Sequence, residues 1–175
     1  MNEIVVTAVG ADRPGIVAAV TGALLELGGN LEETRAALLR GSFATVLAVT
    51  VPDGVGRDEV QAALRPVARE LGLGLWVGDA APRTDAEPLP RAVVSVYGAD
   101  HPGIVHAMAT ALAGAGANII DLSSRLVGDP PIYVLGIEVE LPPRGDAAAL
   151  QGALAPVAAK AGVELAIELE DDEVL

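Results

Sequence analysis

Residues 10–34, GADRPGIVAAVTGALLELGGNLEET, return as residues 98–122, GADHPGIVHAMATALAGAGANIIDL, 88 positions later in the chain. The two stretches are identical at 12 of 25 positions. Each copy places an acid, a proline and a glycine directly before an apolar segment of helical period, where a helix begins. The chain therefore contains one module twice.

Two further blocks show that whole domains are duplicated. TVLAVTV at 45–51 matches YVLGIEV at 133–139, and QAALRPVARELG at 61–72 matches QGALAPVAAKAG at 151–162. The offset grows from 88 to 90 between these blocks, which places two extra residues in the loop between them. We expect a first domain at 1–79, a proline-rich linker at 80–89, a second domain at 90–169 and an acidic tail at 170–175.

Each half gives the same order of elements. Segments 3–9 and 91–97 are rich in β-branched residues and predict strands, and a helix with one apolar stripe follows each of them. The predicted stripes are Val17, Val20, Leu24 and Leu27, and Val105, Met108, Leu112 and Ala115. A strand pair, a second helix and a last strand at 73–77 or 163–169 complete each half. The order βαββαβ predicts two ferredoxin-like α+β domains, each an antiparallel four-stranded sheet with two helices on one face.

The second helix of each half contains a proline, Pro66 or Pro156. Proline inside a helix removes a hydrogen bond and costs about 3 kcal/mol. We therefore expect this helix to be kinked or to start late. The preceding strand pair is predicted to turn near residues 40–41 and near 128–130.

Composition excludes several classes of function. The formal net charge of -13 repels phosphate, so we expect no direct nucleic-acid partner, and the absence of cysteine removes thiolate metal sites and thiol nucleophiles. Residues 101–120 carry no formal charge, yet they are rich in alanine and glycine, so they predict a soluble helix with no membrane contact. The first ten residues are unlike a secretory signal, and we expect a cytoplasmic protein.

The loop Asp12-Arg13-Pro14-Gly15-Ile16 and its copy at 100–104 are the strongest candidate sites. The first N–H groups of a helix have no intrahelical partner and attract anions. They suit a carboxylate, while Asp12 suits an ammonium group, so a free amino acid matches both charges. The alternative is that Asp12 caps the helix by accepting a hydrogen bond from the Gly15 N–H.

Asn30 and Asn118 are a second candidate element, because each follows the glycine turn that ends the first helix. An amide both donates and accepts hydrogen bonds, and this point could lie close to the ligand loop of a neighbouring module. The alternative is that asparagine merely tolerates the left-handed conformation at a helix end.

Other chemistry finds little support. His101 and His106 are five residues apart, which does not match the i, i+4 spacing of a zinc helix, and they read as exposed loop and helix-face histidines. His101 could still tune ligand choice in the second site. We expect no catalytic residue, no metal and no cofactor, because the sequence shows no nucleophile elbow, no nucleotide fingerprint and no metal-binding spacing.

The pattern strand, Asp-x-Pro-Gly-Ile-Val, helix, Gly-x-Asn, strand resembles the ACT domain, a regulatory module that often binds amino acids. Two such domains with nothing attached resemble the glycine cleavage system transcriptional repressor group, whose members contact a separate DNA-binding activator. The resemblance implies strand order 4-1-3-2 and ligands at interfaces between paired domains. The implied ligand-binding residues are Asp12, Pro14, Gly15, Ile16 and Asn30 in the first half, and Asp100, His101, Gly103, Ile104 and Asn118 in the second.

These observations predict a homodimeric, non-enzymatic regulator that senses a small amino acid of the glycine or serine class and signals to a protein partner such as a transcriptional activator. Two alternatives stay open. One is an interaction module that binds no ligand and pairs through sheet edges or helix faces. The other is a detached regulatory subunit of an enzyme of amino-acid metabolism.

Overall fold

The computed structural model describes residues 1–81 and 88–169, and the chain divides into two compact units, Met1–Thr84 and Asp85–Leu175. Most of the predicted linker falls on residues 82–87, which lie outside the described residues, as does the predicted acidic tail. In the part of the chain that is described, no helix is long and apolar enough to cross a membrane.

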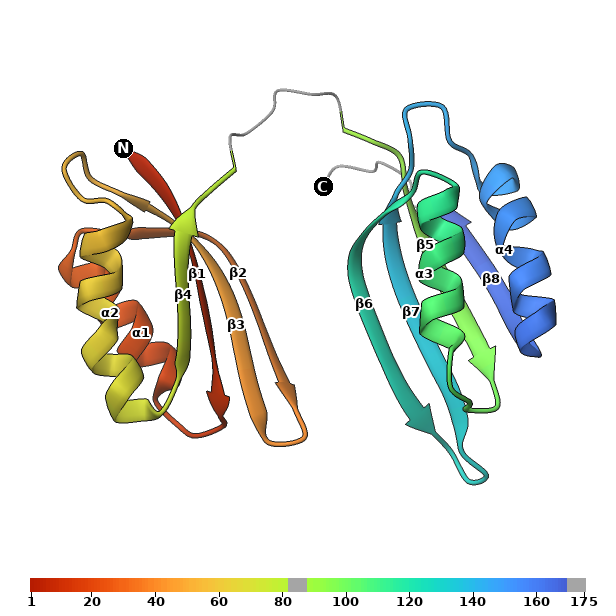
Figure 1. Cartoon of the computed structure of the whole chain (residues 1–175), viewed down its shortest axis with the longest axis horizontal. Coiled ribbons are helices and arrows are strands. Elements are labelled where there is room, and N and C mark those ends of the chain that lie inside the picture. Colours follow the sequence, from red (N-terminus) through yellow and green to blue (C-terminus); the bar gives the residue numbers. More distant parts are fainter. Residues whose placement is uncertain (82–87, 170–175) are drawn as a thin grey trace. The chain divides into compact units, whose positions relative to one another are not determined.

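The first unit has the predicted βαββαβ order. Its elements are β1 (Asn2–Ala11), α1 (Ile16–Glu26), β2 (Asn30–Leu39), β3 (Ser42–Val51), α2 (Arg57–Leu71) and β4 (Gly74–Asp79). The sheet is antiparallel with strand order β2-β3-β1-β4, and both helices lie on one of its faces (Figure 1). This arrangement confirms the predicted ferredoxin-like fold and the strand order.

The second unit repeats this arrangement. Its elements are β5 (Arg91–Gly98), α3 (Ile104–Gly114), β6 (Asn118–Val127), β7 (Ile132–Glu140), α4 (Ala147–Ala161) and β8 (Val163–Leu169), with strand order β6-β7-β5-β8. The two extra residues of this half lie in the β6–β7 turn, not after β7 as the sequence match suggested. Thr7 pairs with Val46 in the first sheet, whereas its counterpart Ser95 pairs with Gly136, so the offset is already 90 in the third strand.

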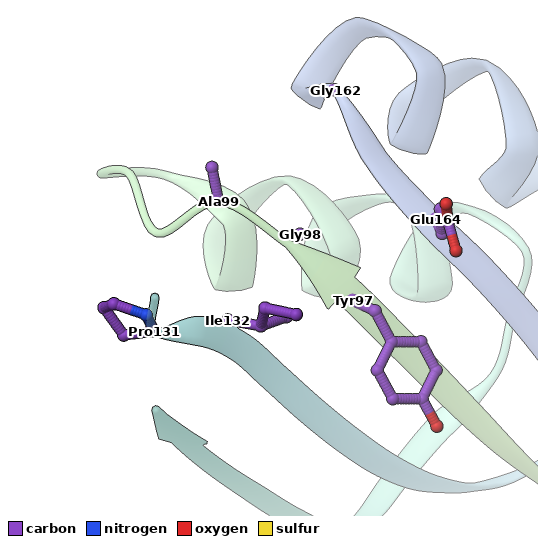
Figure 2. A pocket seen from close by; sticks show the side chains of 7 residues that line it. All are labelled: Tyr97, Gly98, Ala99, Pro131, Ile132, Gly162 and Glu164. Atoms are coloured by element: carbon purple, nitrogen blue, oxygen red, sulfur yellow. The ribbon is translucent and has the colours of Figure 1, made fainter. Parts of the chain in front are cut away.

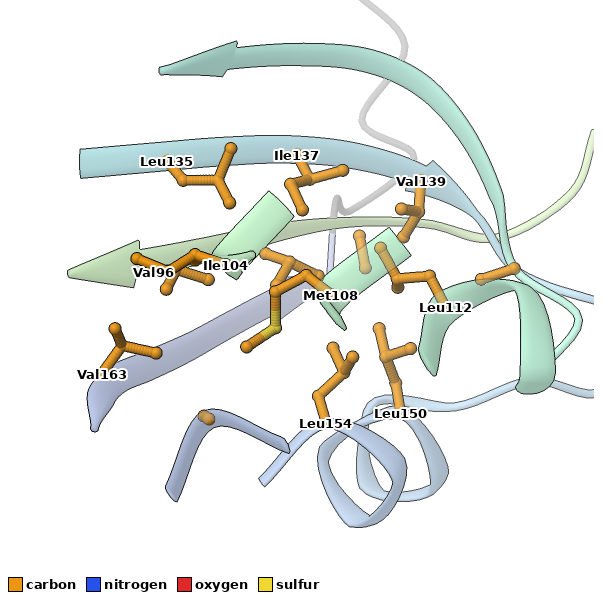
Figure 3. Close-up of a cluster of buried hydrophobic side chains, with 14 of the residues drawn as sticks. Val96, Ile104, Met108, Leu112, Leu135, Ile137, Val139, Leu150, Leu154 and Val163 are labelled. Atoms are coloured by element: carbon orange, nitrogen blue, oxygen red, sulfur yellow. The ribbon is translucent and has the colours of Figure 1, made fainter. Parts of the chain in front are cut away.

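Each core lies between the sheet and the two helices. In the second unit, Leu112 and Leu154 from the helices meet Val96 and Ile137 from the sheet, and all four side chains are completely buried (Figure 3). Burying a side chain of this size contributes about 1.5–3 kcal/mol, so packing on the sheet accounts for much of the helices' stability.

The apolar stripe of the first helix differs from the prediction by one position. Ile16, Val20 and Leu24 are buried, whereas Val17 is 51% exposed. In the copy, Ile104, Met108 and Leu112 are buried and Val105 is 36% exposed. The helix begins at the isoleucine itself, so the buried face follows the i, i+4, i+8 spacing from that residue.

The expectation of a late start for the second helix is wrong. Helix α2 begins nine residues before Pro66, and α4 begins nine residues before Pro156. Both prolines and the residues four positions earlier, Ala62 and Gly152, are exposed. The carbonyl groups that lose their N–H partner therefore face water, which lowers the cost of the proline.

One edge of each sheet is long and uncovered. All ten residues of β2 are exposed, and nine of the ten residues of β6 are exposed. Each of these strands pairs with one neighbour only, β3 or β7.

Candidate functional site

The candidate loop of each unit joins the end of the first strand to the first helix. After β1 ends, the Asp12 N–H donates to the Gly41 carbonyl at 2.9 Å, which ties the loop to the β2–β3 turn. Gly15 then takes a left-handed conformation, with φ of 94°, and precedes the first helical residue. Gly103 does the same with φ of 101°. A residue with a side chain is strained at such angles, so the loop depends on glycine.

The helix that follows the loop has no side-chain cap in either unit. The first intrahelical bonds at this end run from Ala19 to Gly15 and from Ala107 to Gly103, each 2.9 Å long. Residues 14–15 and 102–103 form a turn before each helix. Beyond this turn, no hydrogen bond from the N–H groups of residues 16–18 or 104–106 is present in the described residues. These groups, together with the positive end of the helix dipole, are available to an anion.

The alternative in which Asp12 caps α1 is therefore wrong. The side chain of Asp12 accepts no hydrogen bond from Gly15, which itself occupies the capping position. A true aspartate cap occurs elsewhere: Asp146 accepts a hydrogen bond from the Ala149 N–H at 2.7 Å at the start of α4. Asp12 and Asp100 are exposed, and within the described parts of the chain neither carboxylate accepts a hydrogen bond, although the charge of Asp100 contributes to the raised pKa of His101.

Space is open directly above the loop. A Cβ atom built on Gly15 or on Gly103 meets no heavy atom within 4 Å. Pro14 is exposed next to this space. Ile16 and Ile104 are only 2% exposed, so their side chains belong to the cores and only their backbone N–H groups can reach a ligand.

Asn30 and Asn118 begin the second strand of their units and are exposed. The Asn30 Nδ2 atom donates to Glu32 Oε1 at 3.0 Å, and the same oxygen accepts from the Thr50 hydroxyl at 3.1 Å. Neither asparagine has a positive φ, because Gly28 and Gly116 provide the left-handed residue after each helix. The alternative reading of these asparagines is therefore wrong.

Within one unit, the loop and the asparagine lie at opposite ends of the sheet. Ala11 pairs with Ser42, whereas Asn30 pairs with Thr50, eight residues further along β3. At a rise of about 3.4 Å per residue, the two ends are separated by roughly 27 Å. A small molecule cannot touch both, so the predicted residues do not form one site within a single domain.

His101 links the loop of the second unit to the end of α4 through a side-chain contact. Its Nε2 atom lies 2.7 Å from the Ala161 carbonyl oxygen, and its Nδ1 atom lies 3.2 Å from the Pro102 carbonyl oxygen. Both acceptors require N–H donors, which only the protonated imidazole supplies at both positions. The Ala161 carbonyl, followed by the Pro102 carbonyl, raises the pKa of His101. Arg13 replaces it in the first unit and donates to the Glu70 carbonyl at 2.7 Å.

A groove of about 590 Å³ runs from this histidine between α3 and α4. His101, Gly103, His106 and Lys160 lie along it, with apolar residues such as Val157 between them. Basic side chains, those of His106 and Lys160, therefore lie along the groove next to the second loop. The second unit differs here from the first, where Ala18 and Glu70 stand in place of His106 and Lys160.

Sequence reasoning missed a hollow of about 380 Å³ where β5 ends, next to the same loop (Figure 2). Tyr97 and Glu164, cross-strand neighbours in the sheet, line one side, and Ile132 lies on the other. In the first unit, Val9 stands at the position of Tyr97 and Gly74 at the position of Glu164. A search for features common to both copies therefore does not find Tyr97 and Glu164.

Metal-binding chemistry has no support in the residues that the structure describes, where no group of three or more histidine, aspartate and glutamate side chains could hold an ion. What the loops offer is a set of backbone donors next to a carboxylate. This arrangement can hold a small zwitterion.

The ACT domain profile matches residues 2–77 and again residues 91–168. Phosphoserine phosphatase SerB2 of Mycobacterium tuberculosis is 31% identical over 176 residues, which cover 95% of this chain and 40% of that protein. The glycine cleavage system transcriptional repressor of Escherichia coli is 30% identical over 126 residues, 71% of this chain and 65% of the repressor. The chain thus spans less than half of the phosphatase and somewhat under two thirds of the repressor.

Among solved structures, a protein of unknown function from Galdieria sulphuraria superposes with a TM-score of 0.85 at 28% identity. The match covers 97% of this chain and 99% of that one. The succession of two domains is therefore shared over almost the full length of both chains.

Proposed function

The chain belongs to the ACT domain family, and we propose that it is a regulatory protein that binds a small amino acid between paired domains. Two features of the loops support this proposal. The loops at 12–16 and 100–104 each present helical N–H groups with no hydrogen bond to the described residues, and each places beside them an exposed aspartate whose carboxylate accepts no hydrogen bond.

The separation of loop and asparagine determines how such a site is built. Because Asp12 and Asn30 lie at opposite ends of one sheet, a ligand held by both kinds of residue needs the loop of one domain and the asparagine of another. Two domains that meet end to end would form two such sites. Ligand binding would then favour one relative arrangement of the domains, which is the form of regulation we propose.

The names of two relatives indicate a class of ligand. One is named as a phosphoserine phosphatase and the other as a repressor of the glycine cleavage system, so both names concern serine or glycine. We propose an effector of this class, a protein partner such as a transcriptional activator and no catalytic activity. The partial match to the phosphatase favours one second candidate, a detached regulatory subunit of an amino-acid enzyme.

Isothermal titration calorimetry of the full chain with glycine, serine and a panel of other amino acids tests the proposal. We expect Asp12→Ala and Asp100→Ala each to weaken binding at the affected site. Loss of a hydrogen bond to a charged group corresponds to about 1.5–3 kcal/mol, or a ten- to hundredfold change in Kd.

Asp58→Ala is the matched control, because Asp58 is exposed in the first turn of α2, at the opposite end of that helix from Glu70, which Arg13 of the first loop contacts. It should leave the Kd unchanged. If no amino acid gives binding heat or a thermal shift, the sensing function is wrong, and an interaction module without a ligand is favoured.

A further inference from the structure

The sheet of the first unit has one face turned away from α1 and α2, here called the open face (Figure 1). Two neighbouring cross-strand rows lie at its centre. The first row contains Trp76, Thr7, Val46 and Arg35. The second row contains Gly78, Val5, Ala48 and Glu33.

The centre of the open face carries two large apolar side chains that are exposed. Trp76, the one tryptophan of the chain, is 56% exposed, and Val46 is 46% exposed. The indole lies flat over Gly78, where an added Cβ atom would be 2.3 Å from the ring. Exposed aromatic groups within an apolar patch are typical of protein interfaces.

The second unit does not repeat this surface. At the positions of Trp76 and Val46 it has Ala166 and Gly136, which join Ser95 and Ser123 in one row. The next row contains Glu168, Val93, Glu138 and Asp121. The counterpart surface is therefore polar and acidic, so an apolar open face is not a requirement of the fold.

The two rows of the first unit complement each other. Consider a two-fold axis that lies in the plane of the interface, perpendicular to the strands and midway between the two rows. It places Val46 over Ala48 of a second copy, Thr7 over Val5, and Arg35 over Glu33. Val46 then meets the smaller Ala48, and opposite charges meet on the edge strand β2. Each indole, which lies over its own Gly78, then faces the strand position of Trp76 in the second copy.

Within the described residues, neither Glu33 nor Arg35 has an ion-pair partner. Sheets that pack face to face lie about 10 Å apart with strands within about 30° of alignment, which is compatible with this arrangement. We propose that the open face of the first unit is a homodimer interface, occupied by the same face of a second copy of this chain.

A charge-exchange series measured by sedimentation equilibrium on the full chain tests the proposal. Glu33→Arg and Arg35→Glu each place like charges opposite one another twice in a symmetric dimer. Each should raise the dimer dissociation constant about tenfold. The double variant E33R/R35E restores opposite charges and should restore the affinity. Asp121→Arg, at the matched position of the second unit, should have no effect.

Tryptophan fluorescence provides a second readout, because Trp76 is the only indole. Its emission should shift to shorter wavelength as protein concentration rises through the dissociation constant, and Val46→Glu should abolish the shift. Three outcomes would overturn the proposal: a monomer at all concentrations, a dimer that E33R and V46E leave intact, or an indole already buried at the highest dilution. The last would indicate that another part of the same chain covers this face.

Discussion

The Nε2 atom of His101 lies 2.7 Å from the carbonyl oxygen of Ala161, so the last turn of α4 is joined to the loop that precedes α3. Arg13 makes a similar contact in the first unit, with the carbonyl of Glu70, one residue before the counterpart of Ala161. One unit thus uses a group that titrates near neutral pH and the other uses a permanently charged group.

This difference predicts a pH dependence that belongs to the second unit. The pKa of His101 is raised in the folded protein, first by the Ala161 carbonyl and then by the Pro102 carbonyl. Its contribution to stability is therefore complete below the unfolded value of about 6.5 and is lost as pH rises through the folded pKa. Differential scanning calorimetry between about pH 5.5 and 8.5 should show the Tm falling across this upper range.

His101→Arg is the matched variant, because it copies Arg13. It should remove the part of the pH dependence that His101 causes, whereas His106→Gln should retain it. An H101R protein whose Tm depends on pH as the wild type does would contradict the assigned role.

Asp100 and Asp146 each precede a helix of the second unit, and we expect their alanine variants to differ in the free energy of unfolding. Asp146→Ala removes the cap of α4 and should lower the free energy of unfolding by about 1 kcal/mol. Asp100→Ala removes no hydrogen bond of the described structure and should change it by less than about 0.5 kcal/mol. Urea denaturation followed by circular dichroism measures both. Equal losses would mean that Asp100 is a cap after all.

A pair of glycines in the first unit separates backbone strain from packing. Neither Gly15 nor Gly22 has an atom within 4 Å of an added Cβ, but only Gly15 has a positive φ. Gly15→Ala should therefore destabilise the unit by about 1–2 kcal/mol. Gly22→Ala, inside α1, should stabilise it by about 0.5–1 kcal/mol. Thermal denaturation distinguishes the two, and a stabilising G15A would show that the loop is not held in this conformation.

The buried stripe of α3 can be tested with two alanine variants. Leu112→Ala removes a completely buried side chain and should cost about 2–5 kcal/mol. Val105→Ala acts at a side chain that is 36% exposed and should cost less than about 1 kcal/mol. Chemical denaturation of the full chain gives both values. A larger loss for V105A would restore the stripe that the sequence suggested.

Periodicity and duplication were sufficient to predict the fold. Both halves give the same order of β-branched strands and apolar helices, and this order, βαββαβ, is that of a ferredoxin-like domain. The details that failed depend on single backbone conformations. The left-handed Gly15 sets the first residue of α1, and this shifts the stripe from Val17 to Ile16. The same conformation makes Gly15 the cap in place of Asp12, which the letters Asp-x-Pro-Gly do not reveal.

The candidate site was only partly predictable for a different reason. Spacing along the chain identified Asp12 and Asn30 as polar residues near helix ends, but it carries no information on which end of the sheet each occupies. Strand direction decides this, since β1 and β2 run parallel and place the two residues far apart. Likewise, the contact between His101 and Ala161 joins residues 60 apart and has no local signal.

The uncovered strands β2 and β6 carry a risk of misassembly. A long edge with free backbone donors and acceptors can add strands of other molecules without limit and so lead to insoluble polymers. Glu32, Glu33 and Arg35 interrupt β2 with charge, as Asp121 and Arg125 interrupt β6. Substitutions that neutralise these residues should reduce solubility during expression while leaving the folded domain almost as stable as before.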